Sequence, residues 1–244
     1  MLDRYIAARF VEALAPGEPL TLQSFDDHKP PRRELTAING GNLLRLWPWI
    51  ERQQAAGAGV FVTVCRTPAG RRKTADVTGV RALFVDFDGA VPTSAHLPPS
   101  IVVQSGRGQH WYWLVCDCPV SHFRAAQKRL ILHYGSDPAI HDLPRVMRLP
   151  GTLHQKGEPV LVDLLRCQHL VYPTATVLAG LPALPAPPAP APLPRVRVVG
   201  GMADCATFDA VRYFRDSGAH LAELAGGKHA VVCPWWTQIG RAHV

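Results

Sequence analysis

Apolar positions repeat with two different spacings along the chain, and the spacing predicts where helices and strands lie. Repeats close to 3.6 residues predict three helices, at residues 3–14, 41–56 and 121–134. Short apolar, β-branched and aromatic runs predict strands at residues 20–25, 59–65, 80–88, 101–104, 109–115, 145–149 and 160–165. Only four residues separate the fourth and fifth of these strands, so that pair is expected to form a hairpin. Ser121 is expected to cap the third helix and Gly135 to end it.

The pattern changes after residue 178. Residues 181–194 are almost entirely Ala, Pro and Leu, a composition that favours an extended, semi-rigid spacer. We therefore predict a first domain at residues 1–178, a linker at 179–198, and the start of a truncated second module at 199–237 that is too short for a core of its own. Residues 238–244 match one reading frame of a common sequencing adapter, so we interpret them as an artefact and expect the natural protein to continue.

Composition narrows the class of partner. The 244-residue chain has a net charge of +7 and a pI of about 9.3, which fits a polyanion such as nucleic acid or nucleotides. Six cysteines without a C-x-x-C pair predict reduced thiols and a cytoplasmic protein. No signal-peptide-like segment opens the chain and no apolar run reaches the length of a membrane span, so no membrane partner is expected.

Two aspartates one residue apart, Asp86 and Asp88, close the most apolar of the predicted strands. Side chains at i and i+2 of a strand share a face, so the two carboxylates project together while Phe87 turns into the core. Adjacent carboxylates repel unless a cation neutralises them, and Mg²⁺ or Mn²⁺ with oxygen ligands is the usual solution. The alternative is a pair of solvated aspartates at a strand end.

A glycine-rich turn follows, made by Ser105, Gly106, Arg107 and Gly108, and His110 opens the next strand. Glycines let backbone N–H groups approach a ligand closely, and successive N–H groups can bind an anion. The arginine adds positive charge, so the turn is a candidate phosphate site. The alternative is a simple turn into an aromatic core strand in which the histidine is only hydrogen-bonded.

A third acidic residue, Asp137, precedes a basic segment. Arg145 and Arg148 suit bidentate phosphate contacts, and Lys156 supplies a point charge. Nucleotidyl transfer needs such a set, because carboxylates hold two metal ions and cations neutralise the triphosphate. For the two arginines the alternative is a solvated strand edge.

Three segments carry a family resemblance: V-R-A-L-F-V-D-F-D-G at 80–89, S-G-R-G-Q-H-W-Y-W at 105–113 and R-V-M-R-L-P-G-T at 145–152. In this order they resemble the archaeo-eukaryotic primase superfamily, most closely the plasmid- and phage-borne primase-polymerases that include the replication-protein-B-like primases. The resemblance covers about residues 1–178. It implies an α+β fold, with an RRM-like, mostly antiparallel catalytic sheet and an N-terminal α/β unit.

The resemblance also implies roles. The first-motif aspartates and Asp137 would hold two divalent ions, Mg²⁺ or Mn²⁺, with Asp142 ranked second for the third acid. His110 would contact the phosphates of the incoming nucleotide, Ser105 opens that motif, and His154 stands near the phosphates where relatives have Asn or Lys. The implied function is primer synthesis or extension in plasmid or phage replication. The implied partners are single-stranded DNA, nucleoside triphosphates and a helicase, fused or separate.

Two other functions compete. V-D-F-D-G also resembles the first motif of haloacid-dehalogenase-like phosphatases, with residues 101–105, Lys128 and the Asp137–Asp142 segment as their later motifs. That fold needs parallel strands with helical crossovers, and the twelve residues between Asp88 and Ile101 contain three prolines. The second competitor is a non-catalytic replication-initiator module that stacks single-stranded bases on the aromatic residues of segment 111–113. Its alternative is that these aromatic side chains belong to the core.

Overall fold

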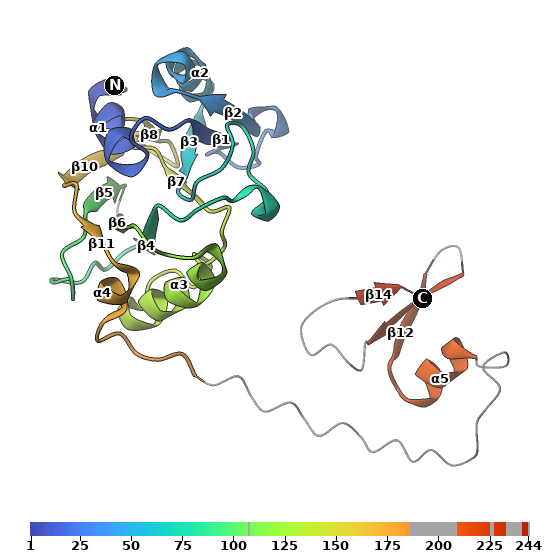
Figure 1. Cartoon of the computed structure of the whole chain (residues 1–244). Coiled ribbons are helices and arrows are strands. Elements are labelled where there is room, and N and C mark those ends of the chain that lie inside the picture. Colours follow the sequence, from blue (N-terminus) through green and yellow to red (C-terminus); the bar gives the residue numbers. More distant parts are fainter. Residues whose placement is uncertain (107, 186–208, 225–226, 233–240, 244) are drawn as a thin grey trace. The chain divides into compact units, whose positions relative to one another are not determined.

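A computed structural model describes residues 1–106, 108–185, 209–224, 227–232 and 241–243. The chain divides into two compact units, Met1–Leu184 and Pro185–Val244, and each is described by itself. Figure 1 shows the elements of both.

The first unit begins with two amphipathic helices that the sequence predicted. Helix α1 spans Arg4–Leu14, and the Asp3 side chain caps it by accepting from the second and third following amides. Helix α2 spans Leu43–Ala55 and is capped by Asn42. Both helices bury one apolar face, and α2 packs on the first sheet (Figure 1).

The first sheet has four antiparallel strands in the order β2-β1-β3-β7. Their bounds are Ala37–Gly41 for β2, Leu20–Asp26 for β1, Ala58–Thr63 for β3 and Val146–Arg148 for β7. Strand β2 is not among the strands expected from the sequence, because Asn and Gly dominate it and weaken the strand signal. The last strand comes from far along the chain and brings the predicted R-x-x-R segment beside β3.

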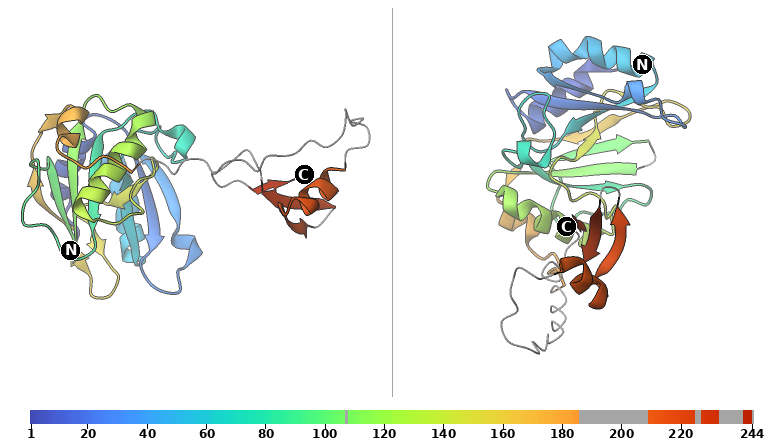
Figure 2. Two further views of the ribbon diagram at one scale, coloured as in Figure 1. Left: turned by 90° about the horizontal axis from the view of Figure 1, so that it is seen from below. Right: turned by 90° about the vertical axis from the view of Figure 1, so that its right-hand side faces the viewer.

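The second sheet carries the D-x-D motif and is mostly antiparallel. It contains β4 (Ala82–Phe87), β5 (Ile101–Ser105), β6 (Gly108–Val115), β10 (Asp163–Cys167) and β11 (Val171–Tyr172). Strand β6 pairs antiparallel with both β4 and β5, and only β11 joins in parallel. The expected hairpin and the expected antiparallel α+β fold are both confirmed. The strands of the two sheets form separate layers in both views of Figure 2.

Helix α3, Val120–Tyr134, packs on β4 and ends at Gly135, whose φ of 61° is the left-handed conformation expected for a terminating glycine. The prediction that Ser121 caps this helix is wrong. Pro119 occupies the cap position, and Ser121 lies within the first turn. Proline fixes φ near the value that a helix start requires, so the helix begins without a side-chain cap.

Short elements complete the unit: η1 (Arg33–Leu35), η2 (Thr74–Asp76), β8 (Leu153–His154), β9 (Val160–Leu161) and α4 (Thr174–Leu178). The single strand predicted at 160–165 is split, because Val162 lies between β9, which pairs with β8, and β10, which pairs with β5.

Aromatic side chains of β6 form much of the core. Tyr112 and Trp113 are completely buried and Trp111 is nearly so. Tyr112 packs against Phe84 of β4, while the two tryptophans surround Tyr134 of α3. Because none of the three aromatic residues of segment 111–113 is exposed, they cannot stack on bases as the initiator hypothesis required.

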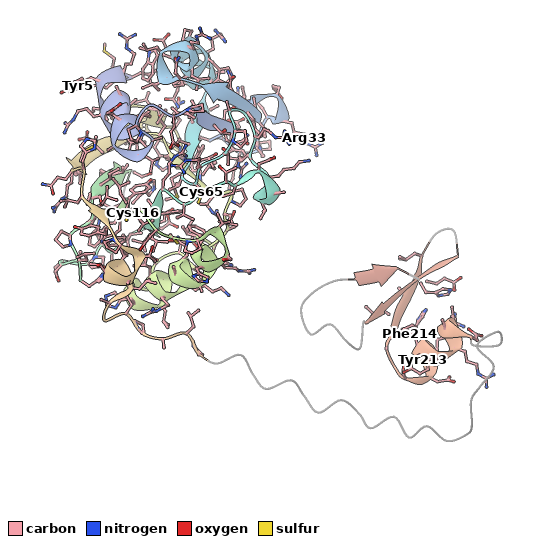
Figure 3. The ribbon with its side chains drawn as sticks, in the orientation of Figure 1. Tyr5, Arg33, Cys65, Cys116, Tyr213 and Phe214 are labelled. Carbon is pink, nitrogen blue, oxygen red and sulfur yellow. The ribbon has the colours of Figure 1, made fainter. Side chains whose placement is uncertain are left out.

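The second unit contains α5 (Ala210–Asp216), β12 (His220–Leu224), β13 (Lys228–Val232) and β14 (Arg241–His243). The three strands form an antiparallel sheet. Tyr213 and Phe214 of the helix meet edge to face, with their ring centres 5.4 Å apart (Figure 3). Most of the predicted Pro/Ala-rich linker lies outside the described residues.

The described cysteines are all free thiols, buried in the case of Cys65 and exposed in the case of Cys116 (Figure 3). Cys205 and Cys233 fall outside the described residues. None of the helices in the described part of the chain has the length and apolar character needed to cross a membrane.

Candidate active site

The D-x-D motif lies at the end of β4. Asp86 faces His110 across the strand pair, and Asp88 follows the last strand residue and is exposed. Phe87 points the other way and packs edge to face against Trp111. The alternation predicted from the sequence is therefore present, with both acids on the face opposite Phe87 and Trp111.

The tertiary structure brings Asp137 to the same place. Its backbone N–H donates to the carbonyl of Asp86 at 3.0 Å, which docks the turn after α3 against β4. Asp142, the second choice for the third acid, instead accepts hydrogen bonds from the Arg145 guanidinium. It is also not among the described residues that line the pocket.

A pocket of about 430 Å³ opens between the two sheets. It is lined by Phe61, Asp86, Phe87, Asp88, Ser105, His110, Asp137, Ile140, Arg145, Val146, Met147, Arg148, His154 and Lys156. Side chains from three separate sequence motifs therefore share one cavity. Its lining combines carboxylates with cations, as a site for a metal-bound phosphate would.

The negative charge of the Asp86 carboxylate is not fully offset by nearby positive charges. Burial, together with the charges of Asp88 and Asp137, raises its pKa to about 7. Arg145 and Arg148 oppose this effect but do not offset it. A cation in the pocket would reduce the repulsion that Asp86 experiences from Asp88 and Asp137, which line the same pocket.

His110 is buried between two polar groups. Its Nε2 lies 3.4 Å from Asp86 Oδ1, and its Nδ1 lies 3.4 Å from the Tyr112 hydroxyl. Burial, followed by the charge of Arg148, lowers the pKa of His110 to about 3. The imidazole is therefore neutral, so its 3.4 Å contact with Asp86 is not an ion pair.

The glycine turn fits tightly against its neighbours. The Gln104 amide holds it by donating to the carbonyls of Gly106 and Gly108. A Cβ on Gly108 would lie 1.8 Å from the Phe87 carbonyl oxygen, and one on Gly106 (φ 66°) would lie 2.6 Å from the His154 ring. Glycine is thus required at both positions. The prediction for Arg107 falls outside the described residues.

The predicted phosphate-binding residues differ in whether their side chains are already paired within the protein. Arg148 is buried and donates two hydrogen bonds, of 2.8 and 2.7 Å, to Asp27, and its guanidinium lies over the Phe61 ring. Lys156 is exposed at the rim of the pocket. His154 lines the pocket, and its buried Nε2 has no hydrogen-bond partner among the described residues. Unsatisfied buried polar atoms are rare, so a ligand at this nitrogen would be stabilised.

Part of the chain matches a protein-family model, and its fold matches solved structures. Residues 75–179 match the family model of the RepB DNA-primase N-terminal domain. The solved AEP domain of the cyanophage S-2L primase-polymerase superposes with a TM-score of 0.62 at 22% identity, over 74% of this chain and 99% of that domain. The first unit therefore has the fold of a primase-polymerase AEP domain, and part of it matches a replication-primase family model.

Two structures of primase RepB′ share the primase-like fold of this chain. Each matches 70% of the chain with a TM-score of 0.54, at 19% and 18% identity. The matches span 58% of one RepB′ chain and 88% of the other, which is its catalytic domain in complex with initiator DNA. At these identities the likeness establishes the fold. No curated protein sequence matches the chain.

The donor set of the pocket suits a hard divalent ion. Three carboxylates supply oxygen ligands of the kind that Mg²⁺ and Mn²⁺ prefer. In the described part of the chain, no group of three or more His, Cys, Asp or Glu side chains is placed so that it could hold a metal ion by itself. Ions that bridge carboxylates to substrate phosphates, as Mg²⁺ commonly does, do not need such a group.

Sequence reasoning missed some residues of the site. Asp27, the partner of Arg148, follows another aspartate at the end of β1 and has no local motif. Phe61 reads only as one apolar residue of β3. Nothing in the order of residues shows that β3 and β7 pair, so no signal in the sequence could have found either residue.

Proposed function

We propose that this chain is a metal-dependent DNA primase-polymerase that joins nucleotides on a single-stranded DNA template. The main support is the pocket that Asp86, Asp88 and Asp137 all line, although Asp137 is remote from the other two in sequence. The family match and the primase-like fold support the same reaction class. The match to a RepB′ domain in complex with initiator DNA supports DNA as the partner.

Each acidic side chain has a role that its position permits. The three carboxylates would hold Mg²⁺ or Mn²⁺. Ions held there would help to deprotonate the attacking 3′-hydroxyl and would offset charge on the leaving phosphate. Asp88 is exposed and so is accessible to a substrate, whereas Asp86 is anchored by its strand.

The remaining pocket residues would bind and orient the nucleotide. Lys156 would pair with the triphosphate from the rim, and Ser105 with the N–H groups of the glycine turn would contact the same phosphates. If Tyr112 donates to Nδ1 of His110, the proton of the neutral ring lies on Nε2, where it orients Asp86. His110 would then act through a hydrogen bond and not through charge.

Primer synthesis on single-stranded DNA with Mn²⁺ tests the proposal. Replacing Asp86 and Asp88 together, or Asp137 alone, by Asn should lower the rate by at least about 100-fold, because charge in the transition state loses its stabilisation. Asp142→Asn is the matched control, since this acid pairs with Arg145 and does not itself line the pocket. Full activity of the double variant would show that the proposal is wrong. A large loss in Asp142→Asn with none in Asp137→Asn would reassign the third acid.

The competing functions have specific difficulties. The phosphatase reading required parallel strands, whereas β4, β6 and β5 are antiparallel. The initiator reading required exposed aromatic residues at 111–113, which are buried. A helicase, fused or separate, stays a predicted partner of the proposed enzyme.

A further inference from the structure

Helix α3 carries a polar side chain that is completely buried against β4. Gln127 has 0% exposure. Its Nε2 donates to the carbonyls of Phe84 and Ile140, each at 2.9 Å, and its Oε1 accepts from Phe84 N at 2.9 Å. One amide thereby satisfies both backbone groups of a strand residue and a carbonyl of a separate turn.

The place of β4 in its sheet explains the need for this amide. Within the described residues, β4 pairs with β6 alone, so the backbone groups on its other edge need partners from elsewhere. Leaving such buried groups unpaired costs about 1–3 kcal/mol each. Gln127 closes this edge at Phe84, and the N–H of Asp137 closes it at the carbonyl of Asp86.

The two segments that Gln127 joins are the ones that carry the acids. Phe84 lies two residues before Asp86 on β4, and both point to the same face. Ile140 closes the turn that begins at Asp137, since its N–H donates to the Asp137 carbonyl at 3.2 Å. Any displacement of the amide would therefore change the separation between the two carboxylates.

We propose that Gln127 is a positioning residue that sets the distance between the Asp86 and Asp137 carboxylates, and this inference rests on the proposed metal-dependent function. The competing explanation is that Gln127 only stabilises the core. The two differ in what its loss affects. A positioning residue controls metal binding beyond its effect on stability, as outer-shell partners of metal sites do, whereas a core residue affects metal binding only through unfolding.

Three variants of the full-length protein separate these explanations. Gln127→Met keeps the length of the side chain and removes all three hydrogen bonds. Gln127→Glu, protonated when buried, has one proton to donate and can satisfy only one of the two carbonyls. Leu130→Ala is the matched control, because Leu130 lies on the same helix, is completely buried and loses packing alone.

The measurements are the thermal midpoint, Mn²⁺ binding by electron paramagnetic resonance, and primer synthesis. We expect Mn²⁺ binding to weaken by about 10- to 100-fold in Gln127→Met and by less in Gln127→Glu, with primer synthesis following. Leu130→Ala should bind Mn²⁺ as tightly as the wild type, even though its thermal midpoint should fall as much as that of the Gln127 variants or more. If Gln127→Met does not fold, the Mn²⁺ binding of Gln127→Glu compared with that of Leu130→Ala decides between the two explanations.

Unchanged Mn²⁺ binding in the folded Gln127 variants, or an equal loss in Leu130→Ala, would overturn the positioning role. The proposed function fails separately. A wild-type protein that makes no primers, but whose Mn²⁺ binding depends on Gln127, would refute primer synthesis and leave the positioning role intact.

Discussion

Asp86 should make the metal-free protein less stable as the pH rises. Its pKa is 3.8 in the unfolded chain and about 7 in the folded protein, so the folded state disfavours the ionised form. The stability associated with the protonated carboxyl is fully present below pH 4 and is lost as the pH rises through 7. At about 1.4 kcal/mol per pKa unit, the loss is about 1.5 kcal/mol at pH 5 and about 4 kcal/mol at pH 8.

Asp86→Asn removes this ionisation without changing the shape of the side chain. We expect its free energy of unfolding at pH 8 to exceed that of the wild type by about 2–4 kcal/mol, with a smaller excess at pH 5 and none near pH 3. Urea denaturation at several pH values, in the presence of a chelator, measures this difference. Adding Mn²⁺ should stabilise the wild type and not the variant, because only the wild type keeps the carboxylate.

Asp88→Asn is the control for this prediction. It removes the same charge from an exposed position, so its effect on stability should stay below about 1 kcal/mol. The reasoning would be refuted if the Asp86→Asn variant were less stable than the wild type at pH 8. An identical pH dependence in the wild type and in Asp86→Asn would also refute it.

Three further predictions concern the surroundings of the acids. Gly108→Ala should displace the end of β4, because its Cβ would lie 1.8 Å from the Phe87 carbonyl oxygen, and both the thermal midpoint and primer synthesis should fall. Arg148→Met should lower the free energy of unfolding by about 3–5 kcal/mol by leaving Asp27 buried and unpaired, and adding Asp27→Leu should restore part of it in a double-mutant cycle. Lys156→Ala should raise the KM for nucleotide in steady-state primer extension, and a loss confined to thermal stability would contradict this role.

Features that depend on neighbouring residues could be predicted from the sequence. Helices α1 and α2 follow from apolar spacing, and the β5–β6 hairpin follows from a short glycine turn between two apolar runs. The shared face of Asp86 and Asp88 follows from the two-residue period of a strand. Strand β2 and the Pro119 start of α3 were missed, because their residue types are poor signals for those structures.

The sequence by itself determined which side chains were available for chemistry: a pair of acids on one strand, a glycine turn with a histidine after it, and a third acid before a basic segment. Only the tertiary structure decided between Asp137 and Asp142 as the acid that lies in the pocket, by docking one turn on the open edge of β4 and pairing the other acid with an arginine. The tertiary structure also pairs Arg148 with Asp27 and raises the pKa of Asp86. These outcomes depend on burial and on contacts between distant segments, and local spacing carries no information about either.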